Sequence, residues 1–400
     1  MMIRTALLAA LFASAAPIAA ETHRVEPGAG AAERLQEALI LAAPGDTVEL
    51  GEGRFVLTDG LSLDVDGVTV AGAGMDKTVL DFTGQQGAGE GLLVTSDNVT
   101  LRAFAVENPK GDGIKSKGAD MIVYDGLRVE WTGGPKATNG AYGIYPVEST
   151  GVLVVNSEVI GASDAGIYVG QSRDITVRGN VVRFNVAGIE IENSRNALVE
   201  RNVATRNTGG LLVFDLPGLP VMGGGNVILR GNAVSDNDTP NFAPPGNIVA
   251  SVRRGTGVLV MANDGVLIEN NAFENNPTAH VMVVAYAQPF GDARYNPHAR
   301  NVIVGTNAFG RGGDDPQLDG REQLLAAFGG ALPPVLWDGI AERADNGLKI
   351  AEGVTGWSLN LARPGQSLAE ARPGPLMLTP VADWEFPEVG APAALEARLK

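Results

Sequence analysis

The sequence has no cysteine, only three histidines and few aromatic residues. Without cysteine it has no disulfide, no thiolate metal ligand and no site for a lipid-anchored cysteine, and the scattered His23, His280 and His298 argue against a transition-metal site. Aromatic residues make up 6% of the chain whereas 53 of its 400 residues are glycine, which favours many tight turns between short strands over a bulky core.

Basic residues and long hydrophobic runs are also scarce. The 30 Lys and Arg residues against 46 Asp and Glu residues give a formal charge of −16, which repels nucleic acid and anionic lipid, although a local basic cluster can still hold an acidic sugar. The apolar run from Ala6 to Ala16 is too short for a membrane span, which needs about 20 residues. With Arg4 before it and small residues before Glu21, it predicts a secretory signal over residues 1–20 and a periplasmic or secreted protein.

What the sequence does contain is a repeat. Glycines recur at intervals of 22, 30, 23, 22, 22 and 47 residues, each before an apolar pair: Gly91, Gly113, Gly143, Gly166, Gly188, Gly210 and Gly257. A period near 22 residues is typical of one turn of a solenoid. After most of these glycines the first and third residues are apolar, as in Ile189 and Ile191, which predicts a strand with these side chains inward.

Asparagines keep step with the glycines and indicate how successive turns are joined. Two rows follow the Gly-led strands, Asn180, Asn202, Asn232 and Asn271 in one and Asn185, Asn207, Asn237 and Asn276 in the other. We expect them at the bends, where asparagine tolerates left-handed backbone and where side-chain amides bond from turn to turn. Their predicted role is therefore structural.

Three short strands per turn around an apolar axis predict an all-β, right-handed parallel β-helix solenoid. The helical spacing of Leu35, Leu39 and Ala42 predicts a helix over Ala31–Ala42 that caps the N-terminal end. The 22-residue phase is lost near residue 310, which predicts an irregular C-terminal cap. The expected organisation is a signal at 1–20, a capping segment at 21–45, the β-helix at 46–310 and a cap or tail at 311–400.

Three excursions from the repeat indicate where a site lies. Extra residues follow Trp131 and Asn237, before a Gly-led strand, and the segment DLPGLPVMG follows the Gly210 strand. All three flank the same sheet on its two sides, and loops carry most binding groups. They predict a groove along the outer face of the sheet of Gly-led strands.

Alternation along these strands gives the outward side chains of that groove. Lys115, Tyr145, Tyr168 and Glu190 are the predicted catalytic row, spanning three turns or about 14 Å, which suits a few sugar units. The predicted substrate-binding residues are Lys117, Glu192, Asp112, Asp164, Phe214 and Asp215. Exposed Lys and Glu on such a face are more often only solvated surface. No metal site is predicted, except that oxygen ligands from Asp112, Asp164 or Glu190 leave calcium open without a calcium-loop signature.

Several segments resemble the bacterial parallel β-helix domain-containing protein family: GDGIKSKGAD, RVEWTGG, NGAYGIYPVES, VIGASDAGIYVGQS, NVAGIEIENS, GLLVFDLPGLP and NDTPNFAPPGNIV. The resemblance covers about residues 45–286. It implies an exported protein with a pectate-lyase-like fold and, as a functional partner, the diheme c-type cytochrome beside which members tend to be encoded. It supplies no catalytic residues. Some members carry a lipoprotein cysteine, which this chain lacks.

Two functions are consistent with these features. The first is a lyase or epimerase on an acidic polysaccharide, with Lys115 or Lys117 neutralising the uronate and Tyr145 or Tyr168 as base or acid. A hydrolase would need two carboxylates; Glu190 and Glu192 share a face with Cα atoms about 6.6 Å apart, but the aspartate cluster of polygalacturonase-like hydrolases is absent. The second is a non-enzymatic accessory protein that binds the cytochrome or a polymer along the solenoid.

Overall fold

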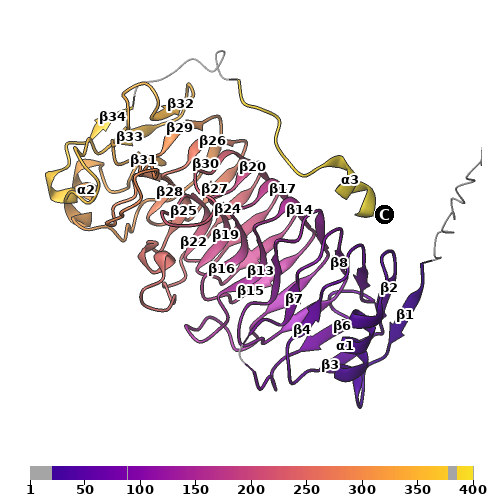
Figure 1. Cartoon of the computed structure of the whole chain (residues 1–400). Helices are drawn as coiled ribbons and strands as arrows, with labels where there is room; N and C mark the ends of the chain where they lie inside the picture. The colour runs from indigo at the N-terminus through magenta and orange to yellow at the C-terminus, as the bar shows by residue number, and fades with distance from the viewer. Residues whose placement is uncertain (1–19, 88, 377–384, 400) are drawn as a thin grey trace, which may run out of the picture.

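The computed structural model describes residues 20–399 except residue 88 and residues 377–384, so the predicted signal segment lies outside the described residues. The chain winds into a solenoid in which each turn contributes one strand to each of three long sheets (Figure 1). Within the described residues these sheets contain 12, 12 and 10 strands, and every strand pair is parallel except the last pair of one sheet. This confirms the predicted right-handed parallel β-helix.

The Gly-led sheet consists of β4 Leu61–Leu63, β7 Leu92–Val94, β10 Ile114–Lys117, β13 Tyr142–Val147, β16 Ala165–Gly170, β19 Ala187–Glu192, β22 Gly209–Phe214, β25 Thr256–Met261, β28 Ala279–Val284, β31 Val335–Trp337, β33 Gly356–Ser358 and β34 Gly374–Pro375.

The second sheet consists of β1 Thr22–Val25, β2 Thr47–Leu50, β5 Thr69–Ala71, β8 Thr100–Arg102, β11 Ile122–Asp125, β14 Thr150–Val155, β17 Arg173–Arg178, β20 Arg195–Glu200, β23 Gly225–Arg230, β26 Asp264–Glu269, β29 Arg300–Val304 and β32 Leu348–Ile350.

The third sheet consists of β3 Gly53–Val56, β6 Thr78–Asp81, β9 Ala105–Glu107, β12 Arg128–Glu130, β15 Glu158–Ile160, β18 Val181–Arg183, β21 Val203–Thr205, β24 Ala233–Ser235, β27 Ala272–Glu274 and β30 Ala308–Phe309. The helices are α1 Ala31–Leu41, α2 Arg321–Ala327 and α3 Ala393–Glu396, with short 3-10 segments at Ile248–Ser251, Leu368–Glu370 and Ala397–Leu399. No helix of the described residues is long and apolar enough to cross a membrane.

The core is the apolar axis that the alternation predicts. In the Gly-led sheet, Ile144, Ile167, Ile189 and Leu211 pair in register from β13 to β22 and are all buried. Each turn therefore buries its apolar side chains against those of its neighbours, which is the main source of stability in a solenoid.

Both asparagine ladders are confirmed. Asn180 Nδ2 donates to Asn202 Oδ1 at 3.0 Å, and Asn185 Nδ2 donates to Asn207 Oδ1 at 3.0 Å. The first ladder continues through Asn232 and Asn271 to Asn307, and the second continues through Asn237 to Asn276, whose amide contacts His280 Nδ1 at 3.2 Å. The expectation of left-handed backbone was wrong for the ladders, because the described asparagines with positive φ are others, such as Asn196 and Asn226 at the start of second-sheet strands.

The predicted N-terminal cap is present. Helix α1 lies across the first turn and buries Leu35 and Leu39. Strand β1, which precedes α1, pairs with β2 and so extends the second sheet by one strand within the predicted capping segment. The first turn thus has its open end covered, which protects the strand edges there.

The β-helix continues beyond residue 310, where we expected only a cap. Strands β31 and β33 extend the Gly-led sheet and β32 extends the second sheet. The repeat was not recognisable there because residues 311–334, which include α2, separate β30 from β31. The 22-residue spacing of glycine and asparagine is therefore lost in this part of the sequence, although its strands still pair with those of the preceding turn.

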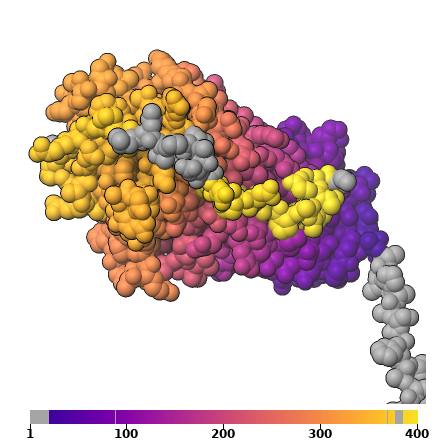
Figure 2. Space-filling view, turned by 90° about the horizontal axis from the view of Figure 1, so that it is seen from above, coloured from indigo at the N-terminus to yellow at the C-terminus, as the bar shows by residue number. Residues whose placement is uncertain are grey.

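The last residues run back along the outside of the solenoid (Figures 1 and 2). There α3 packs against the second sheet: Leu395 is fully buried against Val123, Leu153 and Val155. The guanidinium of Arg178 donates two hydrogen bonds of 2.8 Å to the carboxylate of Glu396. This segment covers an apolar patch on the outer face of β11 and β14.

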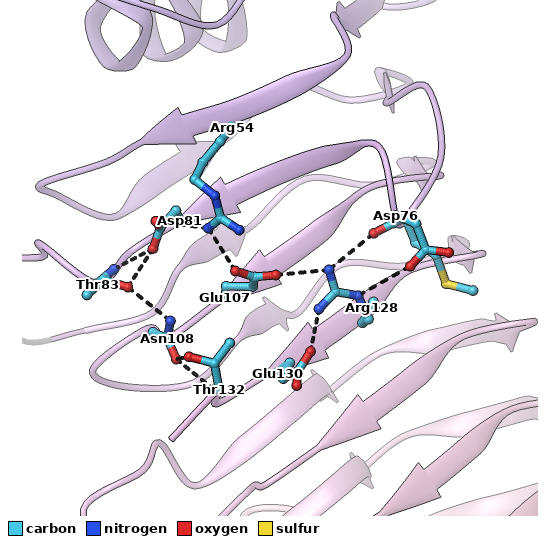
Figure 3. A network of polar contacts seen from close by, with 10 residues as sticks. Arg54, Asp76, Asp81, Thr83, Glu107, Asn108, Arg128, Glu130 and Thr132 are labelled. Atoms are coloured by element: carbon cyan, nitrogen blue, oxygen red, sulfur yellow. Dashed lines mark hydrogen bonds and ion pairs between the residues drawn. The ribbon is translucent and has the colours of Figure 1, made fainter. Parts of the chain in front are cut away.

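The outer face of the third sheet near the N-terminal end carries a ladder of unlike charges (Figure 3). Arg54 Nη1 lies 2.9 Å from Asp81 Oδ2 and 2.8 Å from Glu107 Oε2. Arg128 in turn pairs with Glu107 at 2.9 Å and with Glu130 at 2.5 Å. Alternating charge lets stacked acidic residues share cations, so this row needs no ligand to explain it.

We predict that Asn207→Ala lowers the free energy of unfolding by about 3 kcal/mol or more, because it removes the four buried hydrogen bonds that the Asn207 side chain forms with Asn185 N, Asn185 Nδ2, Val182 O and Asn237 Oδ1. Urea unfolding followed by circular dichroism measures the change. The control is Gln86→Ala, which removes an exposed carboxamide and should change stability by less than about 0.5 kcal/mol. An equal effect of both variants would contradict a structural role for the ladder.

Candidate functional site

The four residues of the predicted catalytic row lie in line on the outer face of the Gly-led sheet. Lys115 pairs with Tyr145 between β10 and β13, and Tyr168 pairs with Glu190 between β16 and β19. The rings of Tyr145 and Tyr168 lie 4.9 Å apart between their centroids. The next position along these strands gives a second row, in which Gly170 pairs with Glu192.

The row is not the open trough that the sequence predicts. Tyr168 is 4% exposed and Glu190 is 1% exposed, and the segment 241–252, here named the covering segment, packs against Tyr168 and Leu212, the two neighbours of Glu190 in the row. Its Val249 and Val252 join a buried apolar cluster with Tyr168 and Phe214. The insertion after Asn237 therefore forms a cover over the face, whereas we expected only a wall beside it.

The covering segment has a defined conformation and one polar contact with the row. Asn241 Nδ2 donates to the carbonyls of Val249 at 2.8 Å and Val252 at 2.9 Å, which folds the segment on itself. Asn247 Nδ2 lies 3.4 Å from Asp164 Oδ2. Both asparagines lie in the segment NDTPNFAPPGNIV that carries the family resemblance, but their contacts could not be predicted because they fall outside the repeat.

Three tyrosines pack together over β13 and β16. Tyr142 lies 4.5 Å from Tyr145 and 4.6 Å from Tyr168 between ring centroids. Tyr142 could not be predicted from the alternation, which places a residue three positions before Tyr145 on the opposite face of the strand. Burial and the nearby carboxylates raise the pKa of all three hydroxyls, so they remain neutral proton donors at ordinary pH.

Asp164, Glu190 and Glu192 lie beside these tyrosines, and we name the six residues the tyrosine–carboxylate cluster. Each carboxyl is no more than 5% exposed. Burial raises the pKa of Asp164 and of Glu192 to about 7 and raises that of Glu190 well above its ordinary value, and the neighbouring carboxylates add to the shift. Among the described residues, Asp164 Oδ1 and Glu190 Oε2 have no hydrogen-bond partner.

One glycine makes room for this arrangement. A Cβ on Gly170 would lie 2.3 Å from the hydroxyl oxygen of Tyr168, so the Tyr168 ring lies across the space that a side chain would fill. This directs the hydroxyl toward Glu192, the neighbour of Gly170 in the second row, and the contact partly lowers the pKa of Glu192. The two carboxyls of β19 thus differ: Glu192 has a tyrosine donor and Glu190 does not.

At the β10 end the row is more open and already charge-paired. Lys115 Nζ lies 3.0 Å from Glu90 Oε1, 3.6 Å from Asp112 Oδ2 and 4.9 Å from the centroid of the Tyr145 ring. Burial raises the pKa of Asp112 to about 6. Lys117 is exposed on the same strand. Lys115 is therefore not a free cation, and its partner Glu90 could not be predicted because it lies before β7, outside the strand alternation.

At the other end, Asp215 and Phe214 hold loops in place. Asp215 accepts hydrogen bonds from Gly224 N at 2.7 Å and Asn263 Nδ2 at 2.9 Å, and the Tyr295 hydroxyl donates to its main-chain carbonyl at 2.7 Å. Burial raises the pKa of Asp215 to about 6. Both carboxylate oxygens have partners, so Asp215 positions the loop after β22.

No group of three histidine, cysteine, aspartate or glutamate residues in the described part of the chain is arranged to hold a metal ion. The calcium ligands left open by the sequence, Asp112, Asp164 and Glu190, do not form such a group.

Comparison with known proteins agrees with this architecture. The family described as "Right handed beta helix region" matches residues 66–216, which include β10 to β22 and the tyrosine–carboxylate cluster. No curated protein sequence matches the chain. The sequence and the three parallel sheets together define the chain as a right-handed parallel β-helix protein.

Two solved structures from Azotobacter vinelandii share the fold. The A-module of mannuronan C-5 epimerase AlgE6 has a TM-score of 0.59 at 17% identity, over 86% of this chain and 97% of that module. The A-module of AlgE4 has a TM-score of 0.56 at 15% identity, over 82% and 94%. An N-terminal fragment of bacteriophage Phi29 gene product 12 gives 0.53 at 14%, over 80% and 59%. At these identities the likeness shows the fold alone.

We predict that Glu192→Gln raises the free energy of unfolding at pH 8 by on the order of 2 kcal/mol and leaves it nearly unchanged at pH 4. Burial raises the folded-state pKa of Glu192 to about 7, above the ordinary 4.5, so the native form binds the proton more tightly than the unfolded form. The wild-type protein therefore loses stability between about pH 4.5 and 7, and a neutral amide removes that loss.

Urea titrations at pH 4, 6 and 8 measure this difference. Glu200→Gln on the second sheet is the matched control and should show no pH-dependent gain. A Glu192→Gln variant that is equally destabilised at every pH would mean that the carboxyl is needed for packing and carries no raised pKa.

Proposed function

We propose that this protein binds an extended polysaccharide along the outer face of the Gly-led sheet and moves a proton at a sugar carbon beside a carboxylate, as a lyase or an epimerase does. The observation that carries the proposal is the pair of buried, unpartnered carboxyl oxygens, Asp164 Oδ1 and Glu190 Oε2, beside three packed tyrosines. Buried polar atoms without partners are rare and costly, and aromatic rings beside carboxyls suit sugar faces and hydroxyls.

The carboxyls of Glu190 and Glu192 on β19 have different environments, and we therefore assign them different roles in catalysis. Glu190, whose pKa burial raises well above its ordinary value and which has no tyrosine donor, stays protonated and donates a hydrogen bond to the uronate carboxylate. Glu192, with a pKa of about 7, is ionised in a large fraction of molecules at neutral pH and takes the C5 proton. The electron pair of the broken C–H bond is then delocalised into the neutralised carboxyl group of the sugar.

The tyrosines complete the step. In a lyase the electron pair expels the oxygen at C4, which takes a proton from the Tyr168 or Tyr145 hydroxyl; in an epimerase a tyrosine returns a proton to C5 from the opposite face. Both outcomes need neutral hydroxyls, which the raised pKa of each tyrosine provides. Lys115, bound to Glu90 and Asp112, orients Tyr145 at the entrance and does not neutralise the substrate.

Access requires the covering segment to move. Lys115 and Tyr145 are partly exposed whereas Glu190 and Glu192 are buried, so the polymer enters at the β10 end and displaces residues 241–252 from the row. Such closure excludes water from a proton-transfer site. The named activity of the two Azotobacter relatives supports the substrate class, and the predicted signal supports a place outside the cytoplasm.

We predict that the full chain, incubated in deuterium oxide with polymannuronate or polygalacturonate, exchanges the C5 proton or forms an unsaturated product, detected by NMR and ultraviolet absorbance. Glu192→Gln should lower the rate by roughly 100-fold or more while retaining binding, because it removes the base. Tyr168→Phe should lower the rate similarly, whereas Glu200→Gln should leave it unchanged.

The alternative is an accessory role beside a diheme c-type cytochrome, which the acidic composition favours through attraction to exposed lysines. Binding of the full chain to a diheme c-type cytochrome is therefore measured at low and at high salt. Cytochrome binding without polysaccharide binding or C5 exchange would overturn the proposal in favour of the accessory role.

A further inference from the structure

The Gly-led sheet carries a second feature at its C-terminal end. A cavity of about 320 Å³ lies over the outer faces of β25, β28 and β31. Its floor and walls are mainly aliphatic: Leu259, Met261, Met282, Val284, Leu336 and Leu361. Ligand sites typically have volumes of roughly 300–1,000 Å³, so this cavity is of a size for one slender ligand.

The cavity is distinct from the tyrosine–carboxylate cluster. The covering segment separates the two: Val252 packs with Tyr168 and Phe214 on one side and lines the cavity on the other. Leu361 and Leu368 line the cavity from the segments that follow β33. Along the sheet, β19 and β28 are three strand spacings apart, which is about 14 Å.

The buried polar groups of the cavity are already bonded. Asp338 accepts hydrogen bonds from Ala285 N at 2.6 Å and Ile340 N at 2.8 Å, one on each carboxylate oxygen. Thr256 Oγ1 donates to the main-chain carbonyl of Arg253 at 2.8 Å, and at the exposed edge Ser251 Oγ donates to that of Ile248 at 2.7 Å. The interior therefore offers mainly dispersion contacts and burial of apolar surface to a ligand.

One charged side chain at the rim of the cavity, that of Arg253, has no partner among the described residues. The side chain of Arg253 is exposed and forms no hydrogen bond or ion pair with any described residue. Its neighbour Arg254 is different, since it pairs with Asp238 and with Asp315. A free guanidinium beside an aliphatic cavity is complementary to an anionic head group on an apolar chain.

We propose that this cavity binds a single-chain fatty acid of medium length, with the alkyl chain over β25, β28 and β31 and the carboxylate at Arg253. The aliphatic lining favours an alkyl chain over a flat aromatic ring, and methionine side chains adapt to a flexible chain. The volume suits one chain and excludes a two-chain lipid. This site does not depend on the proposed polysaccharide chemistry.

Calorimetric titration of the full chain with hexanoate, octanoate and decanoate tests the proposal. The dissociation constant should fall about fourfold for each added methylene, because each buried methylene contributes about 0.8 kcal/mol, until the cavity is full. Met282→Asp, which places a carboxylate on the cavity floor, should abolish saturable binding. Val284→Phe, which fills the space without a charge, gives the same test if Met282→Asp does not fold.

The variant Arg253→Gln distinguishes the contribution of the carboxylate head group to binding from that of the alkyl chain. It should weaken decanoate binding about threefold to fivefold, as expected for an exposed ion pair, and leave decanol binding unchanged. Arg201→Gln, another exposed arginine, is the matched control. Glu192→Gln should leave fatty-acid binding intact, so failure of the proposed polysaccharide chemistry is distinguishable from failure here.

Three results would overturn this assignment. An affinity independent of chain length would mean that the acids bind only the charged surface. Equal weakening of decanoate and decanol by Arg253→Gln would mean that Arg253 merely supports the fold. A dimer in light scattering that excludes decanoate would mean that a second copy of the chain covers the cavity.

Discussion

Parallel main-chain hydrogen bonding fixes which residues of successive turns lie side by side, and the rest of this structure depends on that constraint. Because turns are spaced by about 4.8 Å, each outward side chain meets the side chain at the same position of the next turn. The side chains that stack in one row must therefore be compatible with one another. Inside the solenoid this requirement is met by aliphatic stacking, as between Ile167 and Ile189, and at two bends by asparagine ladders.

Rows of charge meet the same requirement in two ways. On the third sheet Asp81, Glu107 and Glu130 stack in register, and Arg54 and Arg128 from the neighbouring row pair with them, so each carboxylate has a cation. On the Gly-led sheet Glu190 and Glu192 have no cation within ion-pair distance among the described residues, and burial makes their ionisation costly. The first arrangement stabilises the stack, whereas the second destabilises it at neutral pH.

Those features that follow from periodicity could be predicted from the sequence. The spacing placed Lys115, Tyr145, Tyr168 and Glu190 in one line because register alone decides it. The burial of Glu190 could not be predicted, since it depends on how an aperiodic insertion folds over the sheet. The same limit applies to β31 and β33, which continue the sheet after a long interruption, and to Arg253, whose lack of a partner depends on tertiary structure.

The buried carboxyls of this chain divide into two groups by how their oxygens are satisfied. Asp215 and Asp338 each have both oxygens bonded to amide donors of neighbouring loops, so their role in loop structure accounts for their burial. Asp164 and Glu190 each keep one oxygen without a partner among the described residues. Leu212, which follows Glu190 in the same row, is packed with no such cost. An apolar residue at position 190 would thus be expected to stabilise the native fold better, and the polysaccharide that we propose as ligand would supply the partner that Glu190 Oε2 lacks.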